Sequence, residues 1–201
     1  CLYSIFTHIP GLKVVLPASP YDAKGLLIQS IRDNDPVIFL EHKAMYTMEG
    51  EVPEEPYTIP FGEANFVREG KDVTVVAFGR MVVLAAEVAD ELAKRGISVE
   101  VIDPRTTSPL DADSILESIE NTGRLVVVDE SNPRCSMASD IAELAVTQAF
   151  EHLQAPVRTV TAPHTPVPFT SNLEAAYIPS KEKITDAILS VVRPEQQRKA
   201  V

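Results

Sequence analysis

Residues 72–78, DVTVVAF, and 124–130, RLVVVDE, decide the fold, because each is a short run of mainly apolar, β-branched residues. Such runs indicate strands, and without regular alternation of apolar and polar residues they suit strands buried on both faces. ISVEVID at 97–103 and VRTVTAP at 157–163 continue the series. Amphipathic helical segments separate all four, so the sequence predicts an α/β fold, with a mostly parallel sheet and helices on both faces.

The helical segments carry their own boundary signals. Gly96 and Gly123 fall where two helices must stop in a left-handed conformation. Asp111 precedes the second helix as its N-terminal cap, with Ser114 behind it. The helices are predicted at 81–96, 111–123, 136–153 and 180–192, the last followed by a polar end at 193–200.

The first forty or so residues predict a separate strand–helix–strand unit. LKVVLP at 12–17 and PVIFLEH at 36–42 are apolar runs typical of buried strands. Between them, Ser19, Pro20 and Asp22 supply a hydroxyl cap, a proline in the first turn and an acid three residues after the cap, which together predict a helix start. The connection suits a right-handed parallel crossover, but the unit is too small to stand alone. The opening CLYSIFTHIPG resembles the end of an amphipathic helix, which indicates that something upstream is missing.

A change of pattern predicts the domain boundaries. Residues 49–61 contain several prolines and show no sustained period, so we expect a linker there, between a partial domain at 1–48 and a second domain at 62–201. Aromatic and apolar residues in and near this stretch indicate that it packs along a surface. These residues are Tyr57, Ile59, Phe61 and Phe66.

Charge and cysteine content exclude several classes of partner and site. A net charge of -11 and a pI near 4.8 disfavour nucleic acid and anionic membranes as partners. Cys1 and Cys135 lie in no C-x-x-C or Cys/His ligand pattern, so we expect neither a disulfide framework nor a zinc site. No stretch of about 18 apolar residues occurs, and the start lacks the basic-then-apolar order of a signal peptide. We therefore expect a soluble protein of the cytoplasm.

Ligands of open α/β sheets bind beyond the carboxyl ends of the strands, so the turns there are the places to search. FGRM at 78–81 has one glycine where a dinucleotide fingerprint needs three, which favours a tight turn over nucleotide binding. Arg105 could hold a carboxylate or contact a subunit, or it could pair locally with Asp103 or Asp111. We expect it to serve an interface or the structure.

Three further residues have side chains that could act as a nucleophile, a base or a ligand. Cys135 lies near a helix start in DESNPRCS at 129–136, but no histidine is close in sequence, so a turn whose charges are satisfied locally is preferred over a nucleophile. His164 stands between prolines and could line a cleft or contact a partner, although a lone histidine is usually neither base nor ligand. His8 is expected to be a packed histidine at a helix end.

SIRDNDP at 30–36 is a candidate cation site. Asp33 and Asp35 flank a helix end whose free carbonyl groups point outward, and carboxylate and carbonyl oxygens bind hard cations. The alternative is an ordinary turn rich in Asp and Asn, which the residues by themselves favour.

Five segments resemble, in order and over almost the whole chain, the beta subunit of the acetoin and pyruvate dehydrogenase first components. This resemblance implies a heterotetramer of alpha and beta chains that holds thiamine diphosphate and magnesium at alpha–beta contacts. It also implies that 1–48 is the second part of a pyrimidine-binding domain and that 62–201 is a transketolase-like carboxy-terminal domain. The segments are HIPGLKVVLPASPYDAKGLL at 8–27, SIRDNDPVIFLEHK at 30–43, DPRTTSPLD at 103–111, VVVDESNPRCS at 126–136 and PHTPVPFTSNLEAAYIP at 163–179.

The resemblance also implies roles for residues. The family's activating glutamate and its active-site histidine, in an H-S-Q motif, would lie upstream of Cys1, so no catalytic or cofactor-binding residue is assigned to this chain. His8 matches a second family histidine near the cleft. Asp35 stands where an asparagine is common, which puts its part in a cation site in doubt. The family's potassium site would fall on Ser30, Ile31, Asp33 and Asp35.

In the intact complex, the cofactor would attack the substrate carbonyl, and the acyl unit would pass to lipoamide on the next component. This chain would then serve contacts with the alpha subunit and a second beta subunit, one wall of the cofactor cleft, and docking of the lipoyl acyltransferase component. PRCS at 133–136 and PHTP at 163–166 look closer to acetoin dehydrogenases than to pyruvate or branched-chain ones.

Two alternatives stay open. The chain could be an α/β interaction module without a catalytic role, or the carboxy-terminal part of another thiamine enzyme, such as a transketolase or a deoxyxylulose phosphate synthase. By itself we expect the chain to be inactive, to bind thiamine diphosphate weakly and to self-associate through exposed apolar area.

Overall fold

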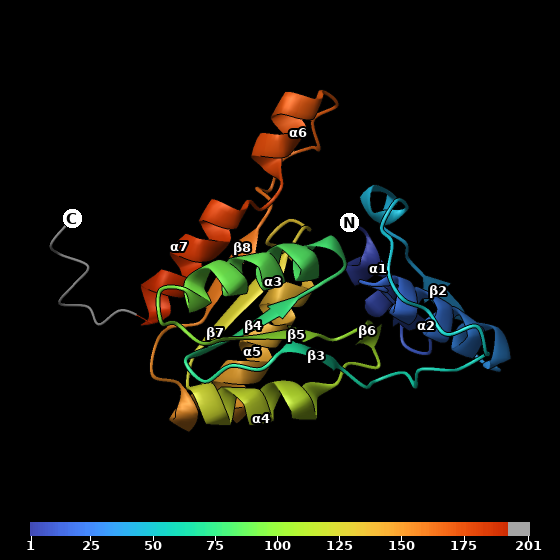
Figure 1. Cartoon of the computed structure of the whole chain (residues 1–201), viewed down its shortest axis with the longest axis horizontal. Helices are drawn as coiled ribbons and strands as arrows, with labels where there is room; N and C mark the ends of the chain where they lie inside the picture. Colours follow the sequence, from blue (N-terminus) through green and yellow to red (C-terminus); the bar gives the residue numbers. More distant parts are fainter. Residues whose placement is uncertain (193–201) are drawn as a thin grey trace, which may run out of the picture.

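The structure is a computed structural model that describes residues 1–192, which form two β-sheets with helices packed around them (Figure 1). The larger sheet belongs to the carboxy-terminal part of the chain, and the amino-terminal unit lies beside it, at the right of the view. The polar end predicted at 193–200 lies outside the described residues. Within residues 1–192, no helix combines the length and the apolar character that a membrane span requires.

The larger sheet has five strands in the order β3-β5-β4-β7-β8. β4, β5, β7 and β8 pair in parallel, which confirms the predicted sheet, whereas the edge strand β3 runs antiparallel to β5. The apolar pattern does not predict β3, because its residues are half-buried or exposed. The bounds are Asn65–Arg68 for β3, Val73–Ala77 for β4, Val99–Asp103 for β5, Leu125–Asp129 for β7 and Arg158–Thr161 for β8.

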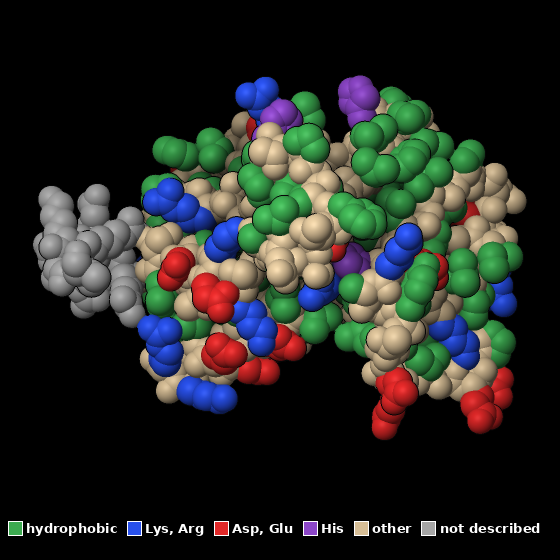
Figure 2. Space-filling view, turned by 90° about the horizontal axis from the view of Figure 1, so that it is seen from above, with side chains coloured by type: hydrophobic (Ala, Val, Ile, Leu, Met, Phe, Trp, Pro, Cys, Tyr) green, Lys and Arg blue, Asp and Glu red, His purple; other side chains and the backbone are tan. Residues whose placement is uncertain are grey.

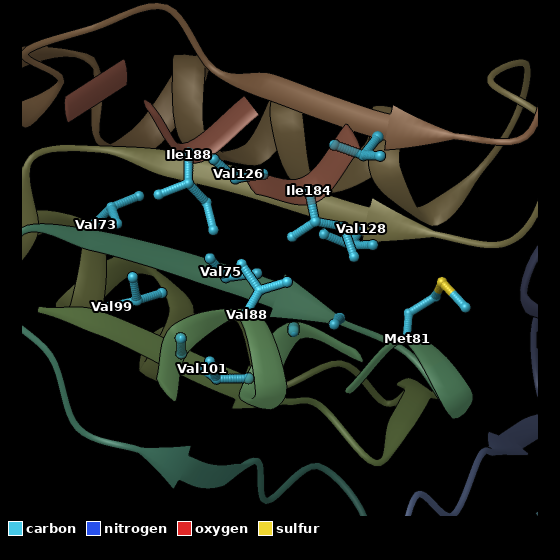
Figure 3. Close-up of a cluster of buried hydrophobic side chains, with 14 of the residues drawn as sticks. Val73, Val75, Met81, Val88, Val99, Val101, Val126, Val128, Ile184 and Ile188 are labelled. Atoms are coloured by element: carbon cyan, nitrogen blue, oxygen red, sulfur yellow. The ribbon is translucent and has the colours of Figure 1, made fainter. Parts of the chain in front are cut away.

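Helices cover both faces of this sheet, as predicted. α3 and α7 pack on one face, where Val75, Val88 and Ile188 share a buried cluster (Figure 3). α4 and α5 contribute Ile115 and Ile141 to a second cluster on the other face. Because both faces are covered, the central strands are mainly apolar. The bounds are Arg80–Ala93 for α3, Ala112–Thr122 for α4, Met137–Gln148 for α5 and Lys181–Val192 for α7.

The helix boundary signals act as predicted. The Ser19 side chain accepts a hydrogen bond from the amide of Asp22, and the Asp111 side chain accepts one from the amide of Ser114. Gly123 ends α4 with a φ of 69°, a left-handed conformation that a residue with a Cβ adopts only at a cost.

The smaller sheet, in the order β2-β1-β6, joins the two parts of the chain. β1 and β2 are parallel and are connected by α2, which confirms the strand–helix–strand unit. β6 comes from the segment 103–111 and pairs antiparallel with β1. The sequence predicts only a turn there, because three residues are too few to show a strand period. The bounds are Lys13–Val15 for β1, Pro20–Arg32 for α2, Val37–Phe39 for β2 and Thr106–Ser108 for β6.

The segment between the two parts packs on the smaller sheet. Ile59 is 5% exposed and shares a buried cluster with Val15 and Leu26. A Cβ built on Gly25 would lie 2.7 Å from side-chain atoms of both Ile59 and Tyr57, so this contact requires glycine in the middle of α2. The expectation that the segment packs along a surface is therefore confirmed for these residues.

Short elements complete the chain. α6 projects from the body at the top of Figure 1, and none of its residues is buried. The sequence pattern does not predict α6, because without a buried face it has no apolar period to show. The bounds are Tyr3–Thr7 for α1, Lys43–Met45 for the 3-10 helix η1, Phe150–His152 for the 3-10 helix η2 and Ser171–Tyr177 for α6.

Candidate functional site

The crevice at the carboxyl ends of β4 and β7 is the place where an open α/β sheet binds ligands. β4 lies between β5 and β7, so the direction of winding reverses there. Gly79, with a φ of 51°, makes the predicted tight turn from β4 into α3. Asp129 ends β7 and Glu130 follows it. In this chain, residues of the amino-terminal unit contact both acids.

Tyr3 of α1 binds the first acid. Its hydroxyl donates a hydrogen bond to Asp129, and both residues are buried. Asp129 also accepts hydrogen bonds from the Ser131 amide at 2.8 Å and from the Ser131 hydroxyl at 2.7 Å. Burial, together with the negative charge of Asp129, raises the pKa of Tyr3 far above its usual range, so the phenol stays protonated and donating.

His42, which follows β2, binds the second acid. Its Nε2 atom lies 3.0 Å from a carboxylate oxygen of Glu130. Burial pushes the pKa of Glu130 upward, but the hydrogen bond and charge of His42 and the charge of Arg80 outweigh this effect, and the pKa lies below its usual value. The expectation that the charges of this turn are satisfied locally is wrong for Glu130, because its partner His42 belongs to the amino-terminal unit. Asp129 has local partners in Ser131, and Tyr3 is added to them.

Arg105 links the two parts of the chain at a third point. Its guanidinium lies 2.7 Å from a carboxylate oxygen of Asp22 on α2, not against Asp103 or Asp111. Its amide donates to Asp103 at 2.9 Å, and its φ is 60°. One oxygen of Asp103 has no hydrogen-bond partner, and burial raises the pKa of this acid to about 7. This contact fits the expected structural or interface use, although it lies within the chain.

A cavity of about 800 Å³ lies between α1 and the loop that leads into α5. His8 is exposed, so the expectation of a packed histidine is wrong, and it lines this cavity together with Arg134 and Cys135. The fold thus brings a histidine to the neighbourhood of Cys135, which the sequence does not reveal. No hydrogen bond between these two side chains is present in the described part of the chain, so they do not form an activated nucleophile pair here.

The candidate cation site has an internal cation. The ammonium group of Lys13 lies 2.7 Å from Asp33 and 3.0 Å from Asp35. The hydrogen bond from Lys13 is the largest cause that lowers the pKa of Asp33. The Ser30 hydroxyl donates back to the Leu26 carbonyl at 2.7 Å, as in an ordinary helix. The Ile31 side chain is 76% exposed. These contacts suit the alternative of an ordinary turn, and the potassium site stays a prediction.

The segment around α6 exposes apolar side chains. His164 is exposed between its prolines, and Phe169, Val167 and Leu173 are exposed on and before α6, Phe169 completely. Figure 2 looks down on this end of the molecule and shows hydrophobic side chains gathered over it. Monomeric proteins rarely leave such patches bare, so this end is suited to contact another protein surface.

The sequence model named "Transketolase, C-terminal domain" matches residues 62–184, which is more than half of the chain. The chain belongs to this transketolase family. A second model, "Transketolase, pyrimidine binding domain", matches residues 1–49 of this transketolase-family chain.

Curated relatives of this transketolase-family chain include beta subunits of oxidoreductases. The chain is 62% identical over 186 residues to "Acetoin:2,6-dichlorophenolindophenol oxidoreductase subunit beta" of Cupriavidus necator. The aligned region is 92% of this chain and 55% of that protein. The subunit of the same name from Bacillus subtilis is 55% identical over 95% of this chain and 56% of its own length. "Pyruvate dehydrogenase E1 component subunit beta" of Bacillus subtilis is 47% identical over 95% of this chain and 59% of its own length. The predicted resemblance to these beta subunits is confirmed.

A solved structure supports the fold. "Split gene transketolase, inactive beta4 tetramer" matches with a TM-score of 0.78 and 25% identity over 95% of this chain and 61% of that one. The chain therefore spans little more than half the length of the relatives it matches.

Proposed function

We propose that this chain is the carboxy-terminal part of the beta subunit of a thiamine-diphosphate-dependent first component that cleaves acetoin oxidatively and passes the acyl group to lipoamide. The observation that carries the choice of substrate is the 62% identity to an acetoin oxidoreductase subunit, against 47% to a pyruvate dehydrogenase subunit over a similar share of the chain. Pyruvate or another 2-oxo acid is the second candidate. A cytoplasmic location belongs to the same proposal.

Within that complex, the role of this chain is to hold the subunits together. Contacts of Tyr3, His42 and Arg105 join the amino-terminal unit to the carboxy-terminal domain, so the two can act as one wall of a cleft. The exposed apolar residues Leu2, Ile5 and Phe169 suit contact with another subunit, because burying them would remove apolar area from water. The partners we propose are the alpha subunit, a second beta subunit and the lipoyl acyltransferase component.

The described residues do not by themselves fit a bound thiamine diphosphate with magnesium. Within residues 1–192 no three acidic, histidine or cysteine side chains come together to hold a metal, and the FGRM turn has a single glycine. In the intact complex, the cofactor would supply the carbon nucleophile of the reaction. Potassium is a separate proposal: an ion at the carboxylates of Asp33 and Asp35 would have to displace the ammonium group of Lys13.

A chimera tests the proposal. The matching region of the Cupriavidus necator subunit is replaced by this chain, and the chimera is produced with the alpha subunit of that enzyme. We expect a stable alpha–beta complex that reduces 2,6-dichlorophenolindophenol with acetoin when thiamine diphosphate and magnesium are present.

The matched control carries the corresponding region of the Bacillus subtilis pyruvate dehydrogenase beta subunit instead. If the chimera that carries this chain assembles but is inactive with acetoin and active with pyruvate, the choice of substrate is reversed. Failure to assemble with the alpha subunit, with the chimera folded, would favour an interaction module or another thiamine enzyme.

A further inference from the structure

The fold brings the two cysteines of the chain to one cavity, although they are far apart in sequence. Cys1 precedes α1 and Cys135 lies in the loop before α5, and both line the cavity of about 800 Å³ described above. Both thiols are free and exposed, so a small molecule dissolved in water can reach them. The sequence pattern gives no sign of this pairing, because no motif joins the two positions.

A network of buried contacts holds the two thiol-bearing segments together. The Tyr3 hydroxyl donates to Asp129, and Ser131 donates to the same carboxylate. Cys1 lies two residues before this tyrosine, and Cys135 lies four residues after this serine. Both cysteines are therefore tethered by short stretches to one buried point.

The backbone at Cys135 is outside regular structure, because this residue lies in a bend with a φ of 49°. A disulfide needs Cα atoms about 4.4 to 6.8 Å apart, and irregular segments can adjust to that spacing more easily than helices or strands can.

We propose that Cys1 and Cys135 form a reversible dithiol–disulfide site whose co-reactant is a small-molecule disulfide of the glutathione class. One cysteine thiolate attacks the glutathione disulfide, which forms a mixed disulfide and releases one glutathione thiolate. The second cysteine, as its thiolate, attacks the bound cysteine sulfur and releases the second glutathione. Two protein thiols are oxidised, one glutathione disulfide is reduced to two thiols, and the two protons leave to water or to the released thiolates.

The bond would tie the segment before α1 to the loop before α5, across the mouth of the cavity that His8 and Arg134 also line. Access to this cavity would then depend on the thiol–disulfide balance of the surroundings. Disulfides in reducing compartments are usually transient and redox-sensing, which is the kind of site proposed.

Equilibration in glutathione redox buffers, followed by alkylation and non-reducing tryptic mass spectrometry, tests the site. Trypsin cuts after Lys13, Arg134 and Arg158, so the expected product is peptide 1–13 joined to peptide 135–158, lighter than the two separate peptides by two hydrogen atoms. The same measurement in concentrated urea is the matched control for proximity. We expect the ratio of internal to mixed disulfide to be at least about tenfold higher in the folded chain, because the fold raises the effective concentration of one thiol at the other.

The single variants Cys1→Ser and Cys135→Ser should each form only the mixed disulfide with glutathione. The proposal is overturned if the folded chain gives the same ratio as the chain in urea, if it forms mainly mixed disulfides, or if the link joins two molecules and rises with protein concentration. None of these outcomes bears on the proposed substrate, because the measurement uses no cofactor and no partner chain.

Discussion

Replacing Asp103 by asparagine tests how the two parts of the chain are joined. Asp103 is 1% exposed, and it accepts a hydrogen bond from the Arg105 amide through one oxygen while the other oxygen has no partner. Burial, with the negative charge of Asp22 adding to it, raises the pKa of Asp103 to about 7. Asparagine has nearly the same shape, keeps the acceptor for the Arg105 amide and carries no charge.

The sign of the effect follows from the direction of the pKa shift. A carboxyl group whose pKa is higher in the folded than in the unfolded protein holds its proton more tightly when folded, so its contribution to stability is lost as the pH rises through that range. With 3.8 for the unfolded state and about 7 for the folded state, ionisation of Asp103 costs roughly 2 kcal/mol near pH 5 and roughly 4 kcal/mol near pH 8.

Urea unfolding of the parent chain and of Asp103→Asn near pH 5 and near pH 8 measures this cost. We expect the variant to be more stable than the parent near pH 8, and its advantage to shrink by about 2 to 3 kcal/mol near pH 5. The matched control is Asp113→Asn, an exposed acid in the first turn of α4, which should change the free energy of unfolding by less than about 1 kcal/mol at either pH.

An equal difference between the variant and the parent at both pH values would refute the argument, because Asp103 would then not change its protonation on unfolding. A variant that is less stable than the parent near pH 8 would refute it in another way. That result would mean that the charge of Asp103 is compensated by Arg105 and stabilises the fold.

Three further changes test other parts of the structure. Tyr3→Phe removes the buried donor to Asp129 and should lower the free energy of unfolding by about 1 to 3 kcal/mol, measured by urea unfolding. Ile59→Ala leaves a cavity against the smaller sheet and should cost about 2 to 5 kcal/mol in the same assay, whereas a loss below about 1 kcal/mol would show that this segment does not pack. Phe169→Ser should leave stability unchanged, since this side chain is fully exposed, but should weaken self-association in sedimentation velocity and capture of the alpha subunit by the chimera. Titration calorimetry of the parent chain with thiamine diphosphate and magnesium should detect no binding at submillimolar concentration, because no described group of side chains can hold the metal.

The central layers of the fold can be predicted from the sequence. The runs at 72–78 and 124–130 are mainly apolar because α3 and α7 cover one face of the sheet and α4 and α5 cover the other. The helix starts at Ser19 and Asp111 and the helix end at Gly123 can also be predicted from the sequence, since a cap acts on backbone groups within the same turn. Motif order over most of the chain also indicates the family.

Contacts between segments that are far apart in the sequence cannot be predicted from the sequence in this way. Tyr3, His42 and Asp22 give no sequence signal of their roles, because their partners Asp129, Glu130 and Arg105 lie far along the chain. The expectation that the charges of the turn at 129–136 are satisfied locally fails for Glu130 for the same reason.

Periodicity and caps thus predicted the central strands and the helices that cover them, because those signals act over a few residues. Only the folded chain decided that the strand β6 completes the smaller sheet, that Tyr3 of the amino-terminal unit binds Asp129 at the end of β7, and that Cys1 and Cys135 share a cavity. The physical reason is that each of these contacts joins residues that are far apart in the sequence, and a local sequence window does not contain that information.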